Sequence, residues 1–173
     1  AWTIWKSPER FTSSYLSTFE GYYHTGDGGF KDDDGYVFIT GRTDDVINVS
    51  GHRLSTGEME EVVSAHPAVA ECAVIGVPDS LKGELPLGLI LLKAGEDIAE
   101  EQLEKELVQM VRDQVGALAC FRKAVVVQRL PKTRSGKILR AILRKIAASE
   151  EYKMPSTIDD ERILGGITDQ LGR

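Results

Sequence analysis

Residues 131–137 of this 173-residue chain, with the sequence PKTRSGK, concentrate groups that bind anions. The segment holds three cations, two hydroxyls and a glycine between the apolar run AVVVQRL and the amphipathic run ILRAILRKI. A lysine beside hydroxyl donors can bind a phosphate or a carboxylate, and a glycine gives the backbone extra conformational freedom. A solvated turn uses the same residue types. The composition therefore leaves two interpretations, a surface turn or a mobile loop that carries Lys137 to an anion.

The overall composition argues against several functional classes. The net charge of −6 disfavours a nucleic-acid-binding protein, which usually carries a basic excess. No apolar run approaches the roughly 18 residues that a membrane helix needs. Two cysteines, Cys72 and Cys120, lie in apolar surroundings, which favours free thiols and a reducing compartment. The chain has neither an initiator Met nor a signal peptide at its start, so we expect it to be a piece of a longer protein.

Residues from about 45 to 150 predict a compact α/β unit with roughly three strands and three helices. Residues 69–79 and 85–95 are nearly continuous in apolar and β-branched side chains, as expected of buried strands. Residues 123–130, KAVVVQRL, predict a third buried strand. The tail after residue 150 is polar and only weakly periodic.

Three helices are predicted from capping signals and apolar spacing. Ser55 and Glu58 have the spacing of a capping box, and so do Asp97 and Glu100. The last helix follows the PKTRSGK segment, with apolar residues at helical spacing between residues 138 and 146. Its cationic residues are expected to face solvent: Arg140, Arg144 and Lys145.

The first 43 residues differ from the compact unit. They are aromatic-rich and broken by FEGYYHTGDGGFKDDDGY, whose glycines and aspartates predict turns. The short β-favouring runs YVFITGR and VINVSG follow, separated by three residues that include Asp44 and Asp45. They predict either a hairpin or two strands that meet at a joint. The two aspartates thus lie at a boundary.

Three motifs then occur in a fixed order: YHTGD at 23–27, GRTDDVINVSGHRLSTGEME at 41–60, and PKTRSGK. Together they resemble the last three signature motifs of the acyl-adenylate-forming (AMP-binding) superfamily. SGHRL and LPKTRSGKI are similar to those of short-chain acyl-CoA synthetases, the acetate–CoA and propionate–CoA ligases. The resemblance covers essentially the whole chain, whereas the family's glycine-rich phosphate loop and acyl pocket are absent from it.

The resemblance implies a fold and a division of the chain. The fold class is α/β (α+β), a small C-terminal lid domain with a roughly three-stranded sheet and flanking helices. Residues 1–43 would be the C-terminal edge of the large N-terminal adenylation domain, residues 44–150 the lid, and residues 151–173 a tail. The large domain of the same protein is then the lid's partner, and this chain alone is expected to be inactive.

The implied reaction joins a short-chain carboxylate to ATP as an acyl-adenylate and then to coenzyme A as a thioester. ATP, Mg²⁺ and coenzyme A are the implied cofactors. Lys137 would act catalytically, by placing a cation against the carboxylate oxygen and the α-phosphate. Acylation of Lys137 would remove that charge, so this lysine is also a possible regulatory target.

The resemblance also assigns the nucleotide and the hinge. Asp27 would accept both ribose hydroxyls, and Arg42 would bind the ribose and phosphate side of the nucleotide. Arg53 matches an arginine that approaches the phosphate in one of two lid orientations. Asp44 matches the hinge about which the lid rotates between the two half-reactions.

Two further sets of residues follow from the same resemblance. Three residues would bind coenzyme A, the first two along the pantetheine path and the third at the nucleotide end: Ser50, Gly51 and Arg112. Main-chain oxygens at a helix end suit a hard cation, and a metal would be bound there by Ser64, His66 and Val69. The alternative for His66 is an ordinary surface histidine before a proline.

Several alternatives stay open. GHRLSTGEME departs from the common acetate-type GHRLGTAEIE, the YKMPSTIDD tail is similar to propionate-type enzymes, and ILRKIAA is similar to acetate-type ones. Another adenylate-forming ligase, such as a peptide-synthetase adenylation domain or a longer-chain ligase, shares the fold. A stand-alone binding or regulatory module is the rival from another class. Neither nucleic acid nor a membrane is an expected partner, and the bacterial cytoplasm or the mitochondrial matrix is the expected compartment, not the exterior.

Overall fold

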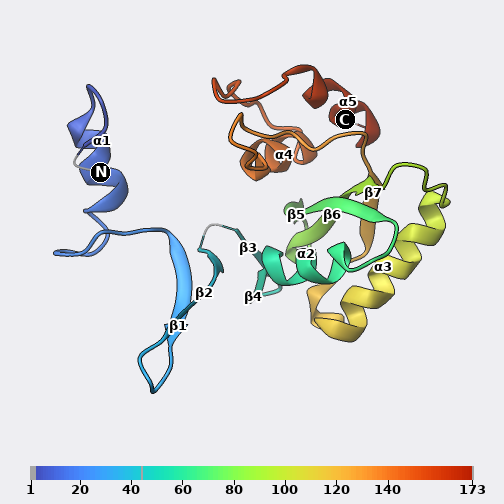
Figure 1. The fold of residues 1–173 in the computed structure, drawn as a ribbon, viewed down its shortest axis with the longest axis horizontal. Helices are drawn as coiled ribbons and strands as arrows, with labels where there is room; N and C mark the ends of the chain where they lie inside the picture. The colour runs from blue at the N-terminus through green and yellow to red at the C-terminus, as the bar shows by residue number, and fades with distance from the viewer. Residues whose placement is uncertain (1–2, 44, 173) are drawn as a thin grey trace. The chain divides into compact units, whose positions relative to one another are not determined.

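The computed structural model describes residues 3–43 and 45–172 (Figure 1). The chain divides into two compact units, Ala1–Asp44 and Asp45–Arg173, which we call the N-terminal unit and the C-terminal unit. Each is described by itself. Within the described residues, no helix has the length and apolar character required to cross a membrane.

The N-terminal unit consists of one helix and one two-stranded sheet. Helix α1 spans Pro8–Tyr15, and its proline stands in the first turn, where the missing N–H has no intrahelical partner to lose. Strands β1, Asp27–Lys31, and β2, Val37–Arg42, pair antiparallel. The one buried hydrophobic side chain among its described residues is Phe11, whose ring lies 5.4 Å from that of Tyr15.

The hairpin of the N-terminal unit exposes apolar side chains. The rings of Phe30 and Phe38 stack with centroids 5.0 Å apart, yet the two residues are 57% and 47% exposed. Val37 and Ile39 are also exposed. Since successive residues of a strand point to opposite faces, the two phenylalanines lie on one face of the hairpin and Val37 and Ile39 on the other, so both faces expose apolar side chains.

The C-terminal unit contains a five-stranded sheet. Its described strands run in the order β4-β3-β6-β5, with β7 pairing parallel to β6 and all other pairs antiparallel. The strands are β3 (Val46–Val49), β4 (His52–Ser55), β5 (Val69–Asp79), β6 (Gly83–Leu92) and β7 (Lys123–Val126).

The predicted strands are confirmed as β5, β6 and β7, although β7 ends at Val126 rather than at residue 130 and its residues are half-buried or exposed. The sheet is wider than predicted, because β3 and β4 join it as a short hairpin. Ser50 and Gly51 form the two-residue turn between β3 and β4, with φ of 50° and 88°. Two positive φ values in a two-residue loop match the right-handed twist of the flanking strands. Since β3 pairs with β4 and β6 while β2 pairs with β1, the two β-favouring runs around residue 44 are not a hairpin.

Five helical segments complete the C-terminal unit: α2 (Thr56–Ser64), α3 (Glu100–Gln114), the short 3-10 helix η1 (Ala117–Ala119), α4 (Arg140–Ala147) and α5 (Arg162–Gln170). The predicted N-cap of α2 is confirmed, because the Glu58 N–H donates to the Ser55 hydroxyl at 3.4 Å. The predicted cap at Asp97 is wrong. Helix α3 starts later, with Ala99 at its N-cap and no side-chain capping bond, and Glu100 and Glu101 stand in the positive first turn.

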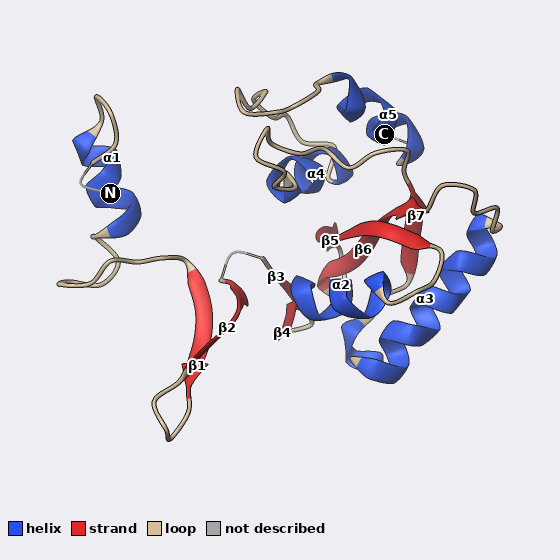
Figure 2. Ribbon diagram, in the orientation of Figure 1, coloured by secondary structure: helices blue, strands red, loops and turns tan. Residues whose placement is uncertain are grey.

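The sheet lies between two helical layers (Figure 2). Successive side chains of a strand point to opposite faces, so β5 contributes to two separate cores. Val74 packs with α2 and α3, whereas Ala73 and Ile75 pack with α4 and α5. The fold class predicted from the sequence, a small α/β unit with flanking helices, is confirmed.

Candidate functional site

In the N-terminal unit, strand pairing brings two of the predicted nucleotide-binding residues together. Asp27 lies opposite Arg42 in the β1–β2 register, and Arg42 Nη1 lies 3.3 Å from Asp27 Oδ1. Arg42 Nη1 also donates to the Thr25 carbonyl at 2.9 Å. Gly26 has φ of 77°, a backbone conformation that favours glycine, and a Cβ there would also lie 2.8 Å from the guanidinium. Both charged side chains are exposed, and the arrangement presents a carboxylate beside a planar guanidinium.

In the C-terminal unit, residues 131–137 form a hydrogen-bonded loop that we call the lysine loop. The Thr133 N–H donates to the Lys137 carbonyl at 2.8 Å, and the Lys137 N–H donates to the Thr133 hydroxyl at 3.1 Å. Gly136 turns the chain with φ of +84°, in the region that other residues rarely adopt. The loop leaves Lys137 exposed, three residues before α4.

The β3–β4 hairpin carries three more predicted residues. Its turn residues are Ser50 and Gly51, and the Ser50 N–H donates to the Lys82 carbonyl at 2.7 Å. Arg53 follows on β4, exposed and opposite Asn48. The three predicted residues therefore lie within one short hairpin.

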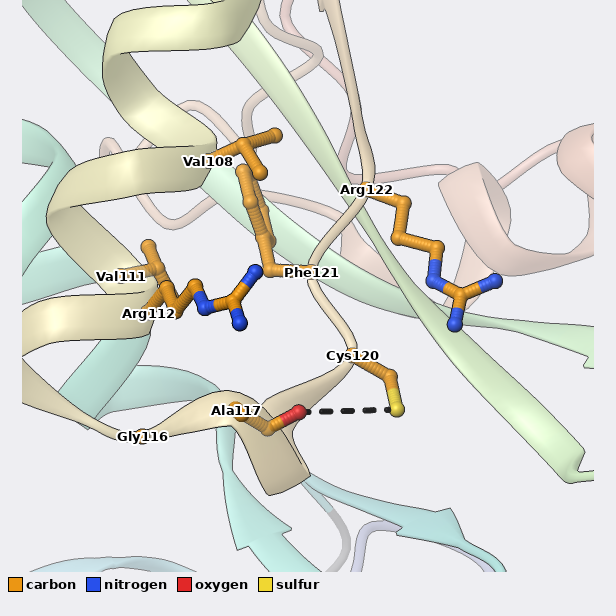
Figure 3. A pocket seen from close by; sticks show the side chains of 8 residues that line it. All are labelled: Val108, Val111, Arg112, Gly116, Ala117, Cys120, Phe121 and Arg122. Carbon is orange, nitrogen blue, oxygen red and sulfur yellow. Dashed lines mark hydrogen bonds between the residues drawn. The ribbon is translucent and has the colours of Figure 1, made fainter.

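Arg112, near the C-terminal end of α3, lines a cavity of about 280 Å³ whose other lining residues include Cys120, Phe121 and Arg122. Its side chain extends from the helix toward the segment that carries Phe121 (Figure 3). Cys120 has φ of 52° and lies 3.1 Å, Sγ to Nζ, from Lys82. Two basic side chains in one cavity wall suit an anionic ligand.

Lys82 connects the hairpin and this cavity, because its carbonyl accepts from Ser50 and its ammonium donates to Cys120. Ser50, Gly51 and Arg112, all predicted for one ligand, thus lie near one end of the C-terminal unit. Sequence reasoning assigned nothing to Lys82. The signal that could have found it is the tight turn PDSLKGE between two predicted strands, which must place its residues at one end of the sheet.

His66 is buried, with 5% exposure, so the alternative of a surface histidine is wrong. Its Nδ1 accepts from the Ala68 N–H at 3.2 Å, which assigns the ring proton to Nε2, 2.8 Å from a Glu106 carboxylate oxygen. That hydrogen bond, with a second from Gln102, holds the pKa of Glu106 below its usual value. The imidazole therefore fixes the end of α2 against α3.

The turn around His66 was also predicted to bind a metal through main-chain oxygens. The His66 carbonyl accepts from the Val69 N–H at 3.0 Å, and the Lys93 ammonium donates to the Pro67 carbonyl. A carbonyl has a second lone pair, so oxygens of Ser64, His66 and Val69 still suit a hard cation, and this site stays a prediction. Within the part of the chain that the structure describes, no group of three or more His, Cys, Asp or Glu residues could hold a metal.

Arg140 and Arg144, which were expected to face solvent, form ion pairs instead. Arg140 donates to both carboxylate oxygens of Glu60, at 3.0 and 2.7 Å. Asp45 lies 3.5 Å from Arg144 and 4.0 Å from Arg140. Burial, the largest single influence, would lower the pKa of Arg140, but its hydrogen bonds to Glu60 together with the negative charges of Glu60 and Asp45 outweigh burial and raise that pKa. The expectation failed because helical spacing does not show which acidic neighbours another element supplies.

These pairs fix the first residue of the C-terminal unit to the helix that follows the lysine loop. Asp45 also accepts at its carbonyl from the Thr56 hydroxyl, at 3.0 Å. Asp44, the predicted hinge, lies outside the described residues. The hinge role of Asp44 stays a prediction. Its neighbour Asp45 is held by its contacts with Arg140, Arg144 and Thr56.

Residues 58–137 match the family model described as AMP-binding enzyme C-terminal domain. These residues therefore form a C-terminal domain of the AMP-binding enzyme family, the family that the sequence motifs resemble. The lysine loop lies at the end of the matched range, and Ser50, Gly51 and Arg53 lie just before its start.

Curated proteins and solved structures agree with this assignment. An uncharacterized protein of Pseudomonas aeruginosa is 68% identical over 167 residues, which are 96% of this chain and 27% of that protein. The mitochondrial acyl-CoA synthetase short-chain family member B of Dictyostelium discoideum is 52% identical, over 95% of this chain and 24% of that protein. The structure of ATP-bound MatB from Rhodopseudomonas palustris has a TM-score of 0.69 and 30% identity, over 83% of this chain and 27% of that one. The chain thus spans about a quarter of the length of these relatives.

Proposed function

We propose that this chain works as the C-terminal part of an ATP-dependent short-chain acyl-CoA synthetase. The enzyme would first join a carboxylate to ATP as an acyl-adenylate, with release of pyrophosphate. It would then transfer the acyl group to the coenzyme A thiol, which breaks the acyl–phosphate bond and releases AMP and the thiol proton. The observation that carries the proposal is the exposed Asp27–Arg42 pair, 3.3 Å apart, in a chain whose lysine loop also exposes Lys137. The name of the Dictyostelium relative supports the short-chain class.

In the first half-reaction, the Asp27 carboxylate accepts hydrogen bonds from both ribose hydroxyls of ATP, and the Arg42 guanidinium binds nearby nucleotide oxygens. Lys137 places its ammonium between the attacking carboxylate and the α-phosphate, where negative charge builds up. Mg²⁺ bound to the triphosphate supplies charge neutralisation of the pyrophosphate that leaves. Arg53 binds phosphate in one of the two lid orientations.

In the second half-reaction, the C-terminal unit turns about Asp44 and presents a different surface. Ser50 and Gly51 then line the path of the pantetheine arm, since a glycine lets the backbone approach the arm closely. Arg112 binds the nucleotide end of coenzyme A in the cavity beside Cys120. The basic side chains of that cavity suit its phosphates.

The remaining parts of the enzyme belong to the large domain that the proposal assigns to the longer protein. That domain supplies the phosphate loop and the acyl pocket, so the choice between acetate and propionate is made there. Acylation of Lys137 would switch off the first half-reaction by removing its charge. We place the enzyme in the bacterial cytoplasm or the mitochondrial matrix, and its relatives include a bacterial protein and a mitochondrial synthetase.

Pyrophosphate exchange and thioester formation test the proposal on the purified longer protein. We expect exchange with acetate or propionate, and coenzyme A-dependent thioester formation with the same acid. Longer acids define the specificity and serve as the comparison. Absence of exchange with every carboxylate would contradict the proposed function. Exchange without any thioester would favour another adenylate-forming ligase of the same fold.

A further inference from the structure

A stretch of the C-terminal tail lies against the lysine loop, residues 131–137. The Asp159 N–H donates to the Lys132 carbonyl at 2.9 Å, and the Arg134 N–H donates to the Thr157 carbonyl at 3.0 Å. These two main-chain bonds have the antiparallel pattern of a β-ladder. The tail therefore places residues 157–159, a turn with a single bridge residue, beside the loop that carries Lys137.

This tail segment is anchored in the core. Ile158, which forms an antiparallel bridge with Thr133, is 4% exposed and belongs to the hydrophobic cluster beneath α4 and α5. Leu164 and Ile167 of α5 belong to the same cluster and are 2% and 1% exposed. A side chain buried to this degree fixes the backbone on either side of it, so the segment is a firm support for the loop.

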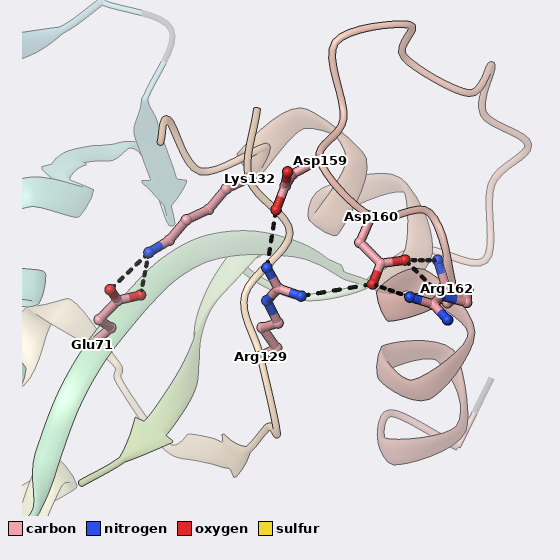
Figure 4. A network of polar contacts seen from close by, with 6 residues as sticks. All are labelled: Glu71, Arg129, Lys132, Asp159, Asp160 and Arg162. Carbon is pink, nitrogen blue, oxygen red and sulfur yellow. Dashed lines mark hydrogen bonds and ion pairs between the residues drawn. The ribbon is translucent and has the colours of Figure 1, made fainter. Parts of the chain in front are cut away.

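Ion pairs flank the contact between the tail segment and the lysine loop (Figure 4). Arg129, just before the loop, lies 3.0 Å from Asp159 and 3.6 Å from Asp160. Lys132, at the base of the loop, lies 2.6 Å from Glu71 on β5. Each pair is partly exposed and contributes little alone. The main-chain bonds and Ile158 are therefore the stronger part of the support.

The lysine loop has few other constraints near its tip. Its own bonds at Thr133, Gly136 and Lys137 are local, and the Lys137 side chain is exposed. A catalytic cation must be placed to within about 1 Å, because small displacements can cost on the order of a hundredfold in rate. Gly136 adds backbone freedom rather than rigidity. Support from outside the loop is thus what would fix its position.

We propose that residues 157–159 of the tail, anchored by Ile158, are a positioning element for Lys137. The proposal rests on the proposed function, in which Lys137 serves the first half-reaction. The segment touches no reacting group and acts through the loop. Its loss should therefore slow formation of the acyl-adenylate and spare transfer of the acyl group to coenzyme A.

Two matched substitutions in the longer enzyme test this. Ile158→Ala and Ile167→Ala remove the same atoms from the same hydrophobic cluster, but of the two isoleucines only Ile158 lies in the segment that pairs with the loop. We expect Ile158→Ala to lower kcat for pyrophosphate exchange about tenfold, with KM for ATP little changed. Thioester formation from supplied acyl-adenylate should stay within about twofold, as should both half-reactions of Ile167→Ala. Equal losses in the two variants, or in the two half-reactions, would overturn the proposal.

A second pair of variants isolates the hydrogen bond from the tail. Asp159→Ala removes the carboxylate that faces Arg129 but keeps the main-chain N–H. Asp159→Pro also removes the donor to Lys132. The proline variant should lose pyrophosphate exchange beyond the loss in the alanine variant, and an equal loss in both would count against a main-chain support.

Amide hydrogen exchange separates this proposal from the proposed function. The Arg134 N–H, which donates to the tail, should exchange about tenfold faster in Ile158→Ala than in Ile167→Ala, whatever the enzyme's substrate. If the unchanged enzyme shows no pyrophosphate exchange with any carboxylate, the proposed function fails, and the amide result still decides whether the tail holds the loop. Unchanged exchange of the Arg134 amide in Ile158→Ala would overturn the tail's role.

Discussion

The two units of this chain use their apolar side chains in opposite ways. The C-terminal unit buries a hydrophobic cluster on each face of its sheet, under α2 and α3 on one side and α4 and α5 on the other. In the described part of the N-terminal unit, Phe11 is the single buried hydrophobic residue, while the β1–β2 hairpin exposes Phe30, Phe38 and their neighbours. The C-terminal unit is thus complete as a folding unit. The N-terminal unit exposes apolar side chains that contact with further protein would cover.

The same contrast extends to the candidate site. The N-terminal unit contributes the Asp27–Arg42 pair from an exposed sheet, whereas the C-terminal unit holds Lys137 and Arg112 on a packed scaffold. Precise placement of a side chain requires rigid support. Under the proposed function, the Asp27–Arg42 pair would gain its support from the large domain of the longer protein, whereas Lys137 and Arg112 are supported within the C-terminal unit.

Separating the units should give the largest effect. A fragment of residues 45–173 should unfold cooperatively, because its two cores are internal to it. A fragment of residues 1–43 should lack stable structure, since a two-stranded hairpin is marginal in water and its apolar face is exposed. Circular dichroism and amide chemical-shift dispersion measure both. A stable fold for residues 1–43 alone would break the comparison.

Single substitutions should reproduce the contrast at smaller scale. Leu89, with 0% exposure, lies in the core of the C-terminal unit, and Leu89→Ala should lower the free energy of unfolding by about 2–5 kcal/mol. Ile39, 66% exposed on β2, should give a change within about 0.5 kcal/mol on replacement by alanine. Urea unfolding of the whole chain measures both values. A loss for Ile39→Ala comparable with that for Leu89→Ala would show that the side chain of Ile39 is buried in solution.

The Arg140–Glu60 pair sharpens the account of the C-terminal unit. Arg140→Met should lower the free energy of unfolding of the C-terminal unit by about 1–3 kcal/mol, because the Glu60 carboxylate loses two charged donors. Arg162, paired with Asp160 but 90% exposed in its side chain, is the matched control, and Arg162→Met should leave the free energy of unfolding nearly unchanged. Equal effects of the two substitutions in thermal or urea unfolding would mean that the Arg140 pair is no more than a surface ion pair.

Thiol labelling, which measures reactivity rather than stability, should distinguish the local environments of the two cysteines, Cys72 and Cys120. Burial raises the pKa of Cys72 to about 12, with help from the charge of Glu60, so its thiolate is scarce near pH 8. Cys120 lines an open cavity and has the Lys82 ammonium beside it. Iodoacetamide at pH 8 should therefore modify Cys120 well before Cys72, as read by mass spectrometry. In urea both should react alike, and fast labelling of Cys72 in the folded protein would contradict its raised pKa.

Much of the C-terminal fold could be predicted from the sequence, because its signals are local. Continuous β-branched runs predict β5, β6 and β7, and the Ser55–Glu58 spacing predicts the cap of α2. The helix α5 was missed, since its apolar residues are few and two glycines interrupt it, and it is held by tertiary packing of Leu164 and Ile167. The cap at Asp97 failed because a spacing of three recurs by chance.

The candidate site was predicted as types of residue rather than as an arrangement. Motif resemblance selected Asp27 and Arg42, but only the β1–β2 register shows that they face each other. The contacts of Lys82 with Ser50 and Cys120, and of the tail with the lysine loop, join residues far apart in the chain. No local pattern encodes such contacts, because they depend on which strand ends and turns meet in the folded protein.

Lys137→Ala in the longer enzyme tests the central claim most directly, with Lys145→Ala, an exposed lysine of α4, as the control. Both half-reactions are measured separately, pyrophosphate exchange with ATP and the acid, and thioester formation from supplied acyl-adenylate and coenzyme A. The account predicts that Lys137→Ala lowers exchange by on the order of a hundredfold or more, while thioester formation stays near that of the control. Equal loss of both half-reactions, or exchange as fast as in Lys145→Ala, would contradict it.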